Sequence, residues 1–272
     1  MIRVVFVVLV LLPVVVLGIP LQWLSLKLGL PSRRWIPILF HRSCAAMFGL
    51  HITVRGKAAE HRPLLLIANH SSWLDITVLS SLMPAVFIAK SEIAGWPLFG
   101  LFAKLQRSVF VDRSRRQATG EVNRTIASRL GDGDPVVLFG EGKASDGNQV
   151  LPFRSALLGA MRDALGNGGR GWVQPVSIAY TRLHGVPMGR QHRPLAAWYG
   201  DMSLVPHLVG VLREGAWDVV VTFGVPFEVG PEVDRKSLAL TAENSVRRMT
   251  VAALAGRKEP DFGAVPLVAE NR

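Results

Sequence analysis

A histidine and an aspartate stand five residues apart, just after an uninterrupted run of aliphatic residues. They are His70 and Asp75. Imidazole titrates near neutral pH and can take a proton from a hydroxyl group, while a carboxylate on its second ring nitrogen holds the useful tautomer and stabilises the imidazolium that forms. The pair is therefore a candidate general base with its orienting acid. The residues alone leave a structural alternative, in which His70 ends a turn and Asp75 caps a helix.

The elements on either side of this pair predict how it is positioned. The aliphatic run at residues 64–68, bounded by a proline and an asparagine, is typical of a buried strand. After it, Ser71 or Ser72 can cap an apolar helix. His70 then lies at a strand end and Asp75 at a helix start, so the two side chains can meet across one tight corner.

Two further polar residues follow short apolar runs that predict strands. Arg113 comes after residues 108–112, and Glu141 comes after residues 136–139. Strands that alternate with helices predict an α/β domain with a mixed, largely parallel sheet flanked by helices, and sites in such sheets lie where strands end. We therefore expect His70, Arg113 and Glu141 to belong to one site.

Four sequence blocks carry a resemblance to a known family. Residues 70–75, His-Ser-Ser-Trp-Leu-Asp, resemble the His-x4-Asp signature of the glycerolipid acyltransferases, which include the 1-acylglycerol-3-phosphate acyltransferases. Three further blocks follow in that family's order: Phe110-Val111-Asp112-Arg113, Phe139-Gly140-Glu141-Gly142 and Val173-Gln174-Pro175-Val176-Ser177-Ile178. One such motif has little specificity, whereas four in order have much more.

The resemblance implies a reaction and the residues that perform it. A fatty acyl group would pass from a thioester, acyl-CoA or acyl carrier protein, to the free hydroxyl of a lysolipid, with no cofactor and no metal. His70 would deprotonate that hydroxyl and Asp75 would orient His70. The residues implied for binding the acceptor are Phe110, Val111, Arg113, Glu141 and Gly142. Lys143, Lys90 and Arg154 are further candidates for an anionic pocket, with ordinary surface charge as their alternative.

The third block departs from the family pattern. It commonly reads Pro-Glu-Gly-Thr-Arg-Ser, whereas here Gly140 precedes the glutamate and Ala144 replaces the arginine, which is a phosphate ligand in the family. This departure argues against lysophosphatidic acid as the acceptor. Residues 145–157 and 198–201 are more similar to the bacterial branch that acylates lyso-ornithine lipid, and ornithine lipid has no phosphate. Both acceptors remain open: the first expectation is 1-acylglycerol-3-phosphate (lysophosphatidic acid), which would give phosphatidic acid, and lyso-ornithine lipid is the alternative.

Two functions from other classes also remain open. One is a non-catalytic membrane lipid-binding protein, which would not need a proton-accepting histidine. The other is a hydrolase in which the same pair activates water. A covalent serine mechanism is disfavoured because the sequence has no G-x-S-x-G elbow.

Charge and cysteine content restrict the partners and the compartment. The formal net charge is +11, which favours anionic membrane surfaces and phosphorylated or carrier-bound substrates. Nucleic acid is not expected as a partner, because no regular basic helix, zinc-ligand spacing or aromatic-basic RNA motif is present. Cys44 is the sole cysteine, so no disulfide can form within the chain, in agreement with a reducing compartment.

The N-terminal segment predicts a membrane anchor. Residues 4–26 carry no charge, and as a helix they would be about 35 Å long against a bilayer core of about 30 Å. Pro13 and Pro20 predict a kinked or broken segment, so a shallow hairpin in one leaflet is the alternative to a span. Basic residues concentrate after the segment, which by the positive-inside rule predicts an inner-membrane protein whose catalytic domain faces the cytoplasm.

These expectations define three parts of the chain. Residues 1–50 form a membrane-associated helical segment, residues 51–260 the acyltransferase domain and residues 261–272 a tail. Within them, residues 35–50 predict a helix that packs on the core or touches lipid. The irregular apolar stretch 91–105 predicts a lid or acyl-chain wall, with core packing as the alternative. Helices are also expected at residues 151–165, 204–212 and 234–255.

Overall fold

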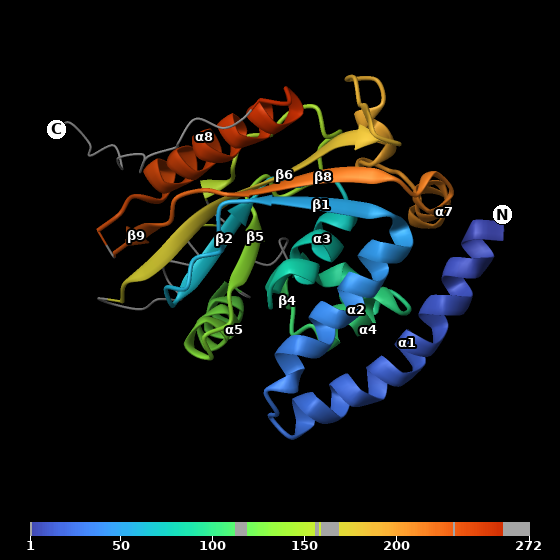
Figure 1. The fold of residues 1–272 in the computed structure, drawn as a ribbon. Helices are drawn as coiled ribbons and strands as arrows, with labels where there is room; N and C mark the ends of the chain where they lie inside the picture. Colours follow the sequence, from blue (N-terminus) through green and yellow to red (C-terminus); the bar gives the residue numbers. More distant parts are fainter. Residues whose placement is uncertain (1, 112–118, 156–157, 159–168, 231, 258–272) are drawn as a thin grey trace.

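A computed structural model describes residues 2–111, 119–155, 158, 169–230 and 232–257. Within these residues, nine strands form one sheet with helices packed around it (Figure 1). The main path of the sheet is β1-β8-β6-β2-β5-β3-β4, and the short strands β7 and β9 pair with β6. The strands are β1 Leu50–Arg55, β2 Leu64–Ala68, β3 Val86–Lys90, β4 Val109–Val111, β5 Val136–Phe139, β6 Gly171–Leu183, β7 Val186–Pro187, β8 Trp217–Phe223 and β9 Phe227–Val229.

The sheet is mixed and mostly parallel, as predicted. Strand β2 is parallel to both of its neighbours, β5 and β6, and β3 is parallel to β5 and β4. Strand β8 is antiparallel to β6, and β1 is parallel to β8, so these two strands run against the other five strands of the main path. The carboxyl ends of β2, β5, β3 and β4 therefore meet at one edge, where the candidate residues follow.

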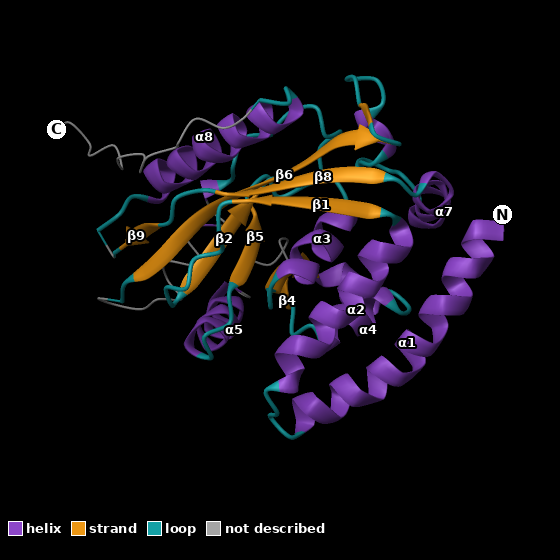
Figure 2. Cartoon of the chain, viewed as in Figure 1, coloured by secondary structure: helices purple, strands orange, loops and turns teal. Residues whose placement is uncertain are grey.

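Helices cover both faces of the sheet (Figure 2). They are α1 Ile2–Lys27, α2 Ser32–Phe48, α3 Leu74–Leu82, α4 Phe99–Leu105, α5 Thr119–Gly131, α7 Leu204–Glu214 and α8 Arg235–Leu254, with 3-10 turns η1 Ser91–Gly95 and η3 Arg193–Leu195. One apolar cluster joins α2, α3 and α7 to one face, and a second joins α5 and α8 to the other.

Strand β2 shows why its residues are all aliphatic. Leu64, Leu66 and Ala68 lie in the first cluster, whereas Leu65 and Ile67 lie in the second. All five side chains have 0% exposure because both faces of the strand are covered. Burial on both faces favours a continuous apolar run over alternation, and this rigid strand carries His70 at its end.

The N-terminal helices form a hairpin at one side of the domain (Figure 1). Helix α1 continues through Pro13 and Pro20, so the predicted break within it is wrong. It is long and apolar enough to cross a membrane by length and composition, and most of it is exposed. Helix α2 contributes to the core through Phe48, which was one of its two expected roles, and it leaves Trp35 and Leu39 exposed. Contact of these two side chains with lipid stays a prediction.

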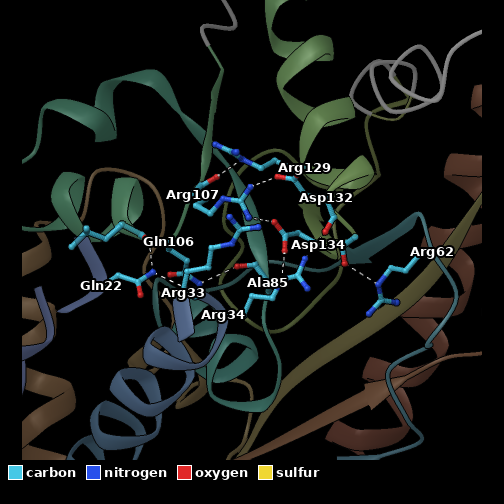
Figure 3. A network of polar contacts seen from close by, with 12 residues as sticks. Gln22, Arg33, Arg34, Arg62, Ala85, Gln106, Arg107, Arg129, Asp132 and Asp134 are labelled. Atoms are coloured by element: carbon cyan, nitrogen blue, oxygen red, sulfur yellow. Dashed lines mark hydrogen bonds and ion pairs between the residues drawn. The ribbon is translucent and has the colours of Figure 1, made fainter. Parts of the chain in front are cut away.

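An ionic network fastens this hairpin to the domain at the amino-terminal edge of the parallel strands (Figure 3). Asp134, which stands just before β5, is 3% exposed and accepts from Arg34 Nε at 2.9 Å. Arg107 pairs with both Asp134 and Asp132. Gln22 of α1 donates to the carbonyl groups of Arg33 and Leu105 at 3.0 and 2.9 Å. These contacts lie at the edge opposite to His70.

Some predicted elements differ or lie outside the described residues. Residues 151–154 are not helical, so the helix expected from Leu151 does not begin there, and most of the remainder of that segment is not described. The stretch 91–105 is not simply irregular, because it contains η1 and α4. Arg113, which was expected to join His70 and Glu141 in one site, lies outside the described residues.

Candidate active site

The corner between β2 and α3 brings His70 and Asp75 into contact. Nδ1 of His70 lies 2.9 Å from Oδ2 of Asp75. The same oxygen accepts the backbone N–H groups of Ser71 and Ser72 at 2.8 and 3.0 Å. The expected serine cap is wrong in its main feature, because the N-cap residue of α3 is Trp73, which makes no side-chain cap, and Ser72 Oγ reaches only the Leu74 N–H, at 3.4 Å. The carboxylate of Asp75 instead binds the N–H groups of the two residues that precede the N-cap.

The second oxygen of Asp75 is bound by a residue that the sequence did not indicate. The hydroxyl of Tyr180, on β6, donates to Oδ1 at 2.8 Å. Burial raises the pKa of Tyr180 well above its ordinary value, and the neighbouring carboxylate of Asp75 adds to the effect. The phenol therefore remains a proton donor. Within the described chain, Asp75 receives four hydrogen bonds and is 0% exposed, so its charge is satisfied and its position fixed.

This arrangement selects one tautomer of His70. A carboxylate at Nδ1 holds the proton there and leaves Nε2 as the acceptor. The imidazole ring stacks on Phe139 with 4.0 Å between ring centroids and an interplanar angle of 17°. The side chain of His70 is 19% exposed, whereas that of Asp75 is 0% exposed. The imidazole is thus reachable from outside, whereas the carboxylate beside it is fully buried.

Glu141 supports the same corner from the end of β5. Its Oε1 accepts from the backbone N–H of His70 at 2.9 Å, and its Oε2 accepts from that of Leu151 at 3.1 Å. Burial raises the pKa of Glu141 to about 8, while the two backbone donors oppose that rise. Since both oxygens bind main chain and the residue is 2% exposed, the structure shows Glu141 joining two loops rather than facing solvent.

Gly140, at which the third block departs from the family pattern, is explained by packing. A Cβ atom at Gly140 would lie 2.6 Å from the ring of Phe153. The backbone here is held on both sides, because Gly140 N–H donates to the Ala68 carbonyl at 3.0 Å and its own carbonyl accepts from Arg154 N–H at 2.9 Å. A larger residue at position 140 would need Phe153 to move.

The remaining predicted residues are spread along the strand ends. Lys143 is exposed on the loop that follows β5, and Gly142 is buried with a positive φ of 71°. Phe110 and Val111 lie half-buried on β4, which β5 and β3 separate from β2. With about 4.8 Å between neighbouring strands, β4 lies roughly 14 Å from β2 across the sheet. Lys90 and Arg154 are exposed.

Asn69 is a second positioning residue that the sequence did not indicate. Its side-chain amide donates to the Ile178 carbonyl at 2.8 Å, and its Oδ1 accepts from the Ile178 N–H at 2.8 Å. This double contact fixes the residue before His70 against β6. Its position directly after the aliphatic run could have marked it as a residue of the site. Its partner, however, could not be predicted, because Ile178 is more than 100 residues away along the chain.

Two other segments close over the corner. Ser145 N–H donates to the His70 carbonyl at 2.9 Å, and Trp198 N–H donates to the Ser71 carbonyl at 2.7 Å. The Trp198 ring contacts that of Trp96 edge to face at 6.2 Å between centroids. The stretch 91–105 therefore reaches the site through an aromatic contact, while its role as a lid or acyl-chain wall stays a prediction.

Comparison with known proteins gives a consistent set of matches. A family model described as Acyltransferase matches residues 51–191. The lyso-ornithine lipid O-acyltransferase of Brucella abortus (strain 2308) is 54% identical over 245 residues, covering 89% of this chain and 92% of that protein. The 1-acyl-sn-glycerol-3-phosphate acyltransferase of Neisseria gonorrhoeae is 31% identical over 217 residues, 79% of this chain and 81% of that protein.

A solved structure has the same fold. The crystal structure of the 1-acyl-sn-glycerophosphate (LPA) acyltransferase PlsC from Thermotoga maritima matches with a TM-score of 0.57 and 23% sequence identity, over 84% of this chain and 83% of that chain. The predicted α/β architecture is thus confirmed by both the strand order and this neighbour.

Proposed function

This chain belongs to the acyltransferase family, and on that premise we propose that it transfers a fatty acyl group from a thioester to the free hydroxyl of lyso-ornithine lipid. The resemblance carried by the four sequence blocks is confirmed by these matches. The acceptor is chosen because a protein named for it shares 54% identity over nearly the whole chain, whereas the relative named for 1-acyl-sn-glycerol-3-phosphate shares 31%. The loss of the phosphate-binding arginine at Ala144 supports the same choice.

The observation that supports catalysis most directly is the position of His70 between a sealed carboxylate and solvent. Nε2 of His70 accepts the proton of the acceptor hydroxyl as the oxygen attacks the thioester carbonyl. A new ester bond forms, the carbon–sulfur bond breaks, and the proton on the imidazolium passes to the leaving thiolate. Asp75 stabilises the imidazolium between the two proton transfers, with its four hydrogen bonds keeping it in place.

The acyl donor in this proposal is acyl-CoA or acyl carrier protein, both of which present a thioester. Excess positive charge on the chain, formally +11, favours either anionic donor. Arg113 remains a proposed ligand of the acceptor head group on the strength of its sequence block.

The apolar, exposed helix α1 indicates association with a membrane. We place it in the inner membrane with the catalytic domain on the cytoplasmic side, because the basic residues follow the apolar segment. Exposed Trp35 and Leu39 on α2 would then contact the lipid surface beside it.

The test supplies purified full-length protein with acyl-CoA or acyl carrier protein thioesters and a panel of acceptors that includes lyso-ornithine lipid and lysophosphatidic acid. Ornithine lipid should form with the native protein and not with His70→Ala. Turnover of lysophosphatidic acid alone would reject the proposed acceptor. Thioester loss that is independent of any acceptor would indicate a hydrolase, and unchanged cellular function of His70→Ala would favour a non-catalytic lipid-binding protein.

A further inference from the structure

Two buried polar atoms stand beside the catalytic corner without partners. Ser71 is 2% exposed, and its Oγ has no hydrogen-bond partner among the described residues. The buried Nε of Arg193 also has no hydrogen-bond partner among the described residues, while its Nη1 donates to Asn148 Oδ1 at 3.3 Å. Buried polar groups are paired in the great majority of cases, so two orphan atoms close to a catalytic histidine call for a specific explanation.

Both residues lie close to Gly147. A Cβ atom built on Gly147 would be 3.8 Å from Arg193 Cβ and 4.0 Å from Ser71 Cβ. Ser145, in the same loop, donates its N–H to the His70 carbonyl at 2.9 Å. Residues 145–148 therefore run between the catalytic corner and η3, and a group bound here is a neighbour of the hydroxyl that His70 deprotonates.

The charges around this loop favour a particular kind of ligand. Arg190 and Arg193 both interact electrostatically with Asp146, which is the carboxylate within the loop. Burial lowers the pKa of Arg193 and repulsion from Arg190 adds to this, whereas Asp146 acts in the opposite direction. Excess positive charge attracts an anionic group, but a carboxylate beside it disfavours a phosphate dianion and suits a ligand that also carries an amine.

We propose that Arg193, together with Ser71, binds the carboxylate of an amino-acid head group on the acceptor lipid, with Asp146 serving its amino group. The inference rests on the proposed function, because ornithine linked to a lipid through one amino group keeps a free carboxylate and a second amino group. Arg193 then supplies a guanidinium beside the loop in which Ala144 has replaced the family's phosphate-binding arginine. A guanidinium pairs with a carboxylate through two parallel hydrogen bonds.

The test uses the full-length protein in lipid–detergent micelles and two acceptors, lyso-ornithine lipid and its carboxamide analogue. The variants are Arg193→Gln and Arg193→Lys. Arg170→Gln is the matched control, since its exposed pair with Glu228 lies beside the amino end of β6, away from His70. For each, KM is measured separately for the acceptor and for the acyl donor.

Arg193→Gln should raise the acceptor KM at least about tenfold, as expected for the loss of a charge-assisted hydrogen bond, and leave the donor KM unchanged. Arg193→Lys should lose less, and Arg170→Gln should behave as the native protein. The native protein should use the carboxamide as poorly as Arg193→Gln uses the acid, and Arg193→Gln should lose nothing further on the carboxamide.

Each contrary result has a distinct meaning. If the native protein acylates the carboxamide as well as the acid, the carboxylate site is wrong, and this arm needs no altered protein. A rise in donor KM in place of acceptor KM would assign Arg193 to the phosphates of the donor and overturn the proposal. If the native protein does not acylate lyso-ornithine lipid at all, the proposed function fails, and the head-group site fails with it.

Discussion

Tyr180 donates its hydroxyl proton to Oδ1 of Asp75 at 2.8 Å, through the carboxylate oxygen that His70 does not use. Strand β6 thus fixes the Asp75 carboxylate through Tyr180, while His70 follows strand β2. The pairing of these two parallel strands sets the geometry of the His70–Asp75 contact, because Leu64 to Ala68 align with Trp172 to Val176. Asn69 reinforces this alignment through the main chain of Ile178.

Tyr180→Phe should slow the reaction without weakening substrate binding. The ring keeps its packing, but Asp75 loses one of its hydrogen bonds and becomes free to turn away from His70. We expect kcat to fall about tenfold and the free energy of unfolding to fall by about 1–2 kcal/mol. Steady-state kinetics should show unchanged KM values for donor and acceptor. A large rise in either KM would mean that Tyr180 lies in the substrate path.

Asp75→Asn should be far more damaging to catalysis than Tyr180→Phe. A neutral amide cannot stabilise the imidazolium as a carboxylate does. Its NH2 group would also face hydrogen-bond donors, because all four groups around Asp75 donate to it. We expect kcat to fall by about 100-fold or more. Radiolabelled acyl transfer checks the rate, and circular dichroism of the same sample checks that the fold is retained. Near-native turnover in a folded Asp75→Asn protein would contradict the catalytic pair.

Glu141 should make stability depend on pH in a defined interval. Its pKa is about 8 in the folded protein, against an ordinary value of 4.5. The folded state therefore binds the proton more tightly, and this stabilisation is fully present below pH 4.5 and is lost as pH rises through about 8. Denaturant unfolding in micelles should show stability declining over that interval in the native protein. In Glu141→Gln the decline should be absent or smaller, and equal slopes would contradict the prediction.

Gly140→Ala should strain the loop that carries Glu141. The new Cβ would meet the Phe153 ring at 2.6 Å, which we expect to cost about 1–3 kcal/mol of unfolding free energy. Combining it with Phe153→Leu should relieve the clash, so that the double variant is more stable than the sum of the two single effects predicts. Chemical denaturation of the four proteins measures this coupling. Strict additivity would show that Phe153 does not set the requirement for glycine.

The network in Figure 3 should contribute to stability unequally through its two carboxylates. The Asp134 side chain is 4% exposed and pairs with Arg34 and Arg107, whereas that of Asp132 is 40% exposed. Asp134→Asn removes the carboxylate shared by Arg107, which is 12% exposed and keeps its pair with Asp132, and by Arg34, which is 38% exposed, and should cost about 1–3 kcal/mol. Asp132→Asn should cost less than about 1 kcal/mol. Thermal unfolding of both variants checks the difference, and kcat should remain near the native value because the network lies at the opposite edge from His70.

The sequence predicted the buried strands more accurately than the helix starts. The aliphatic runs at 64–68 and 136–139 coincide with β2 and β5, because a strand covered on both faces leaves no room for polar residues. The helix expected at 234–255 is α8, capped by Asp234. At residue 151 the helical pattern failed, since the N–H groups of Leu151 and Phe153 donate to Glu141 and Glu243. Such distant acceptors leave no local sequence signal.

The same limit applies to the active site. His70 and Asp75 could be paired from the sequence because they are five residues apart in one corner. Tyr180 and Arg193 could not be assigned, since each reaches the corner only through the folding of segments more than 100 residues away from it. The serine cap was mispredicted because the Asp75 carboxylate holds the backbone N–H groups of both serines, so that the two residues precede the N-cap, which is Trp73.

Among the described residues, strand β1 pairs only with β8. During translation β1 leaves the ribosome early and must wait for β8 until most of the polypeptide has been synthesised. Helix α1 emerges before either strand, so its arrival at the bilayer can tether the nascent chain while β1 is still an open edge. Chains that stop before β8 would expose that edge, and we expect them to aggregate or be degraded rather than accumulate as a smaller folded core.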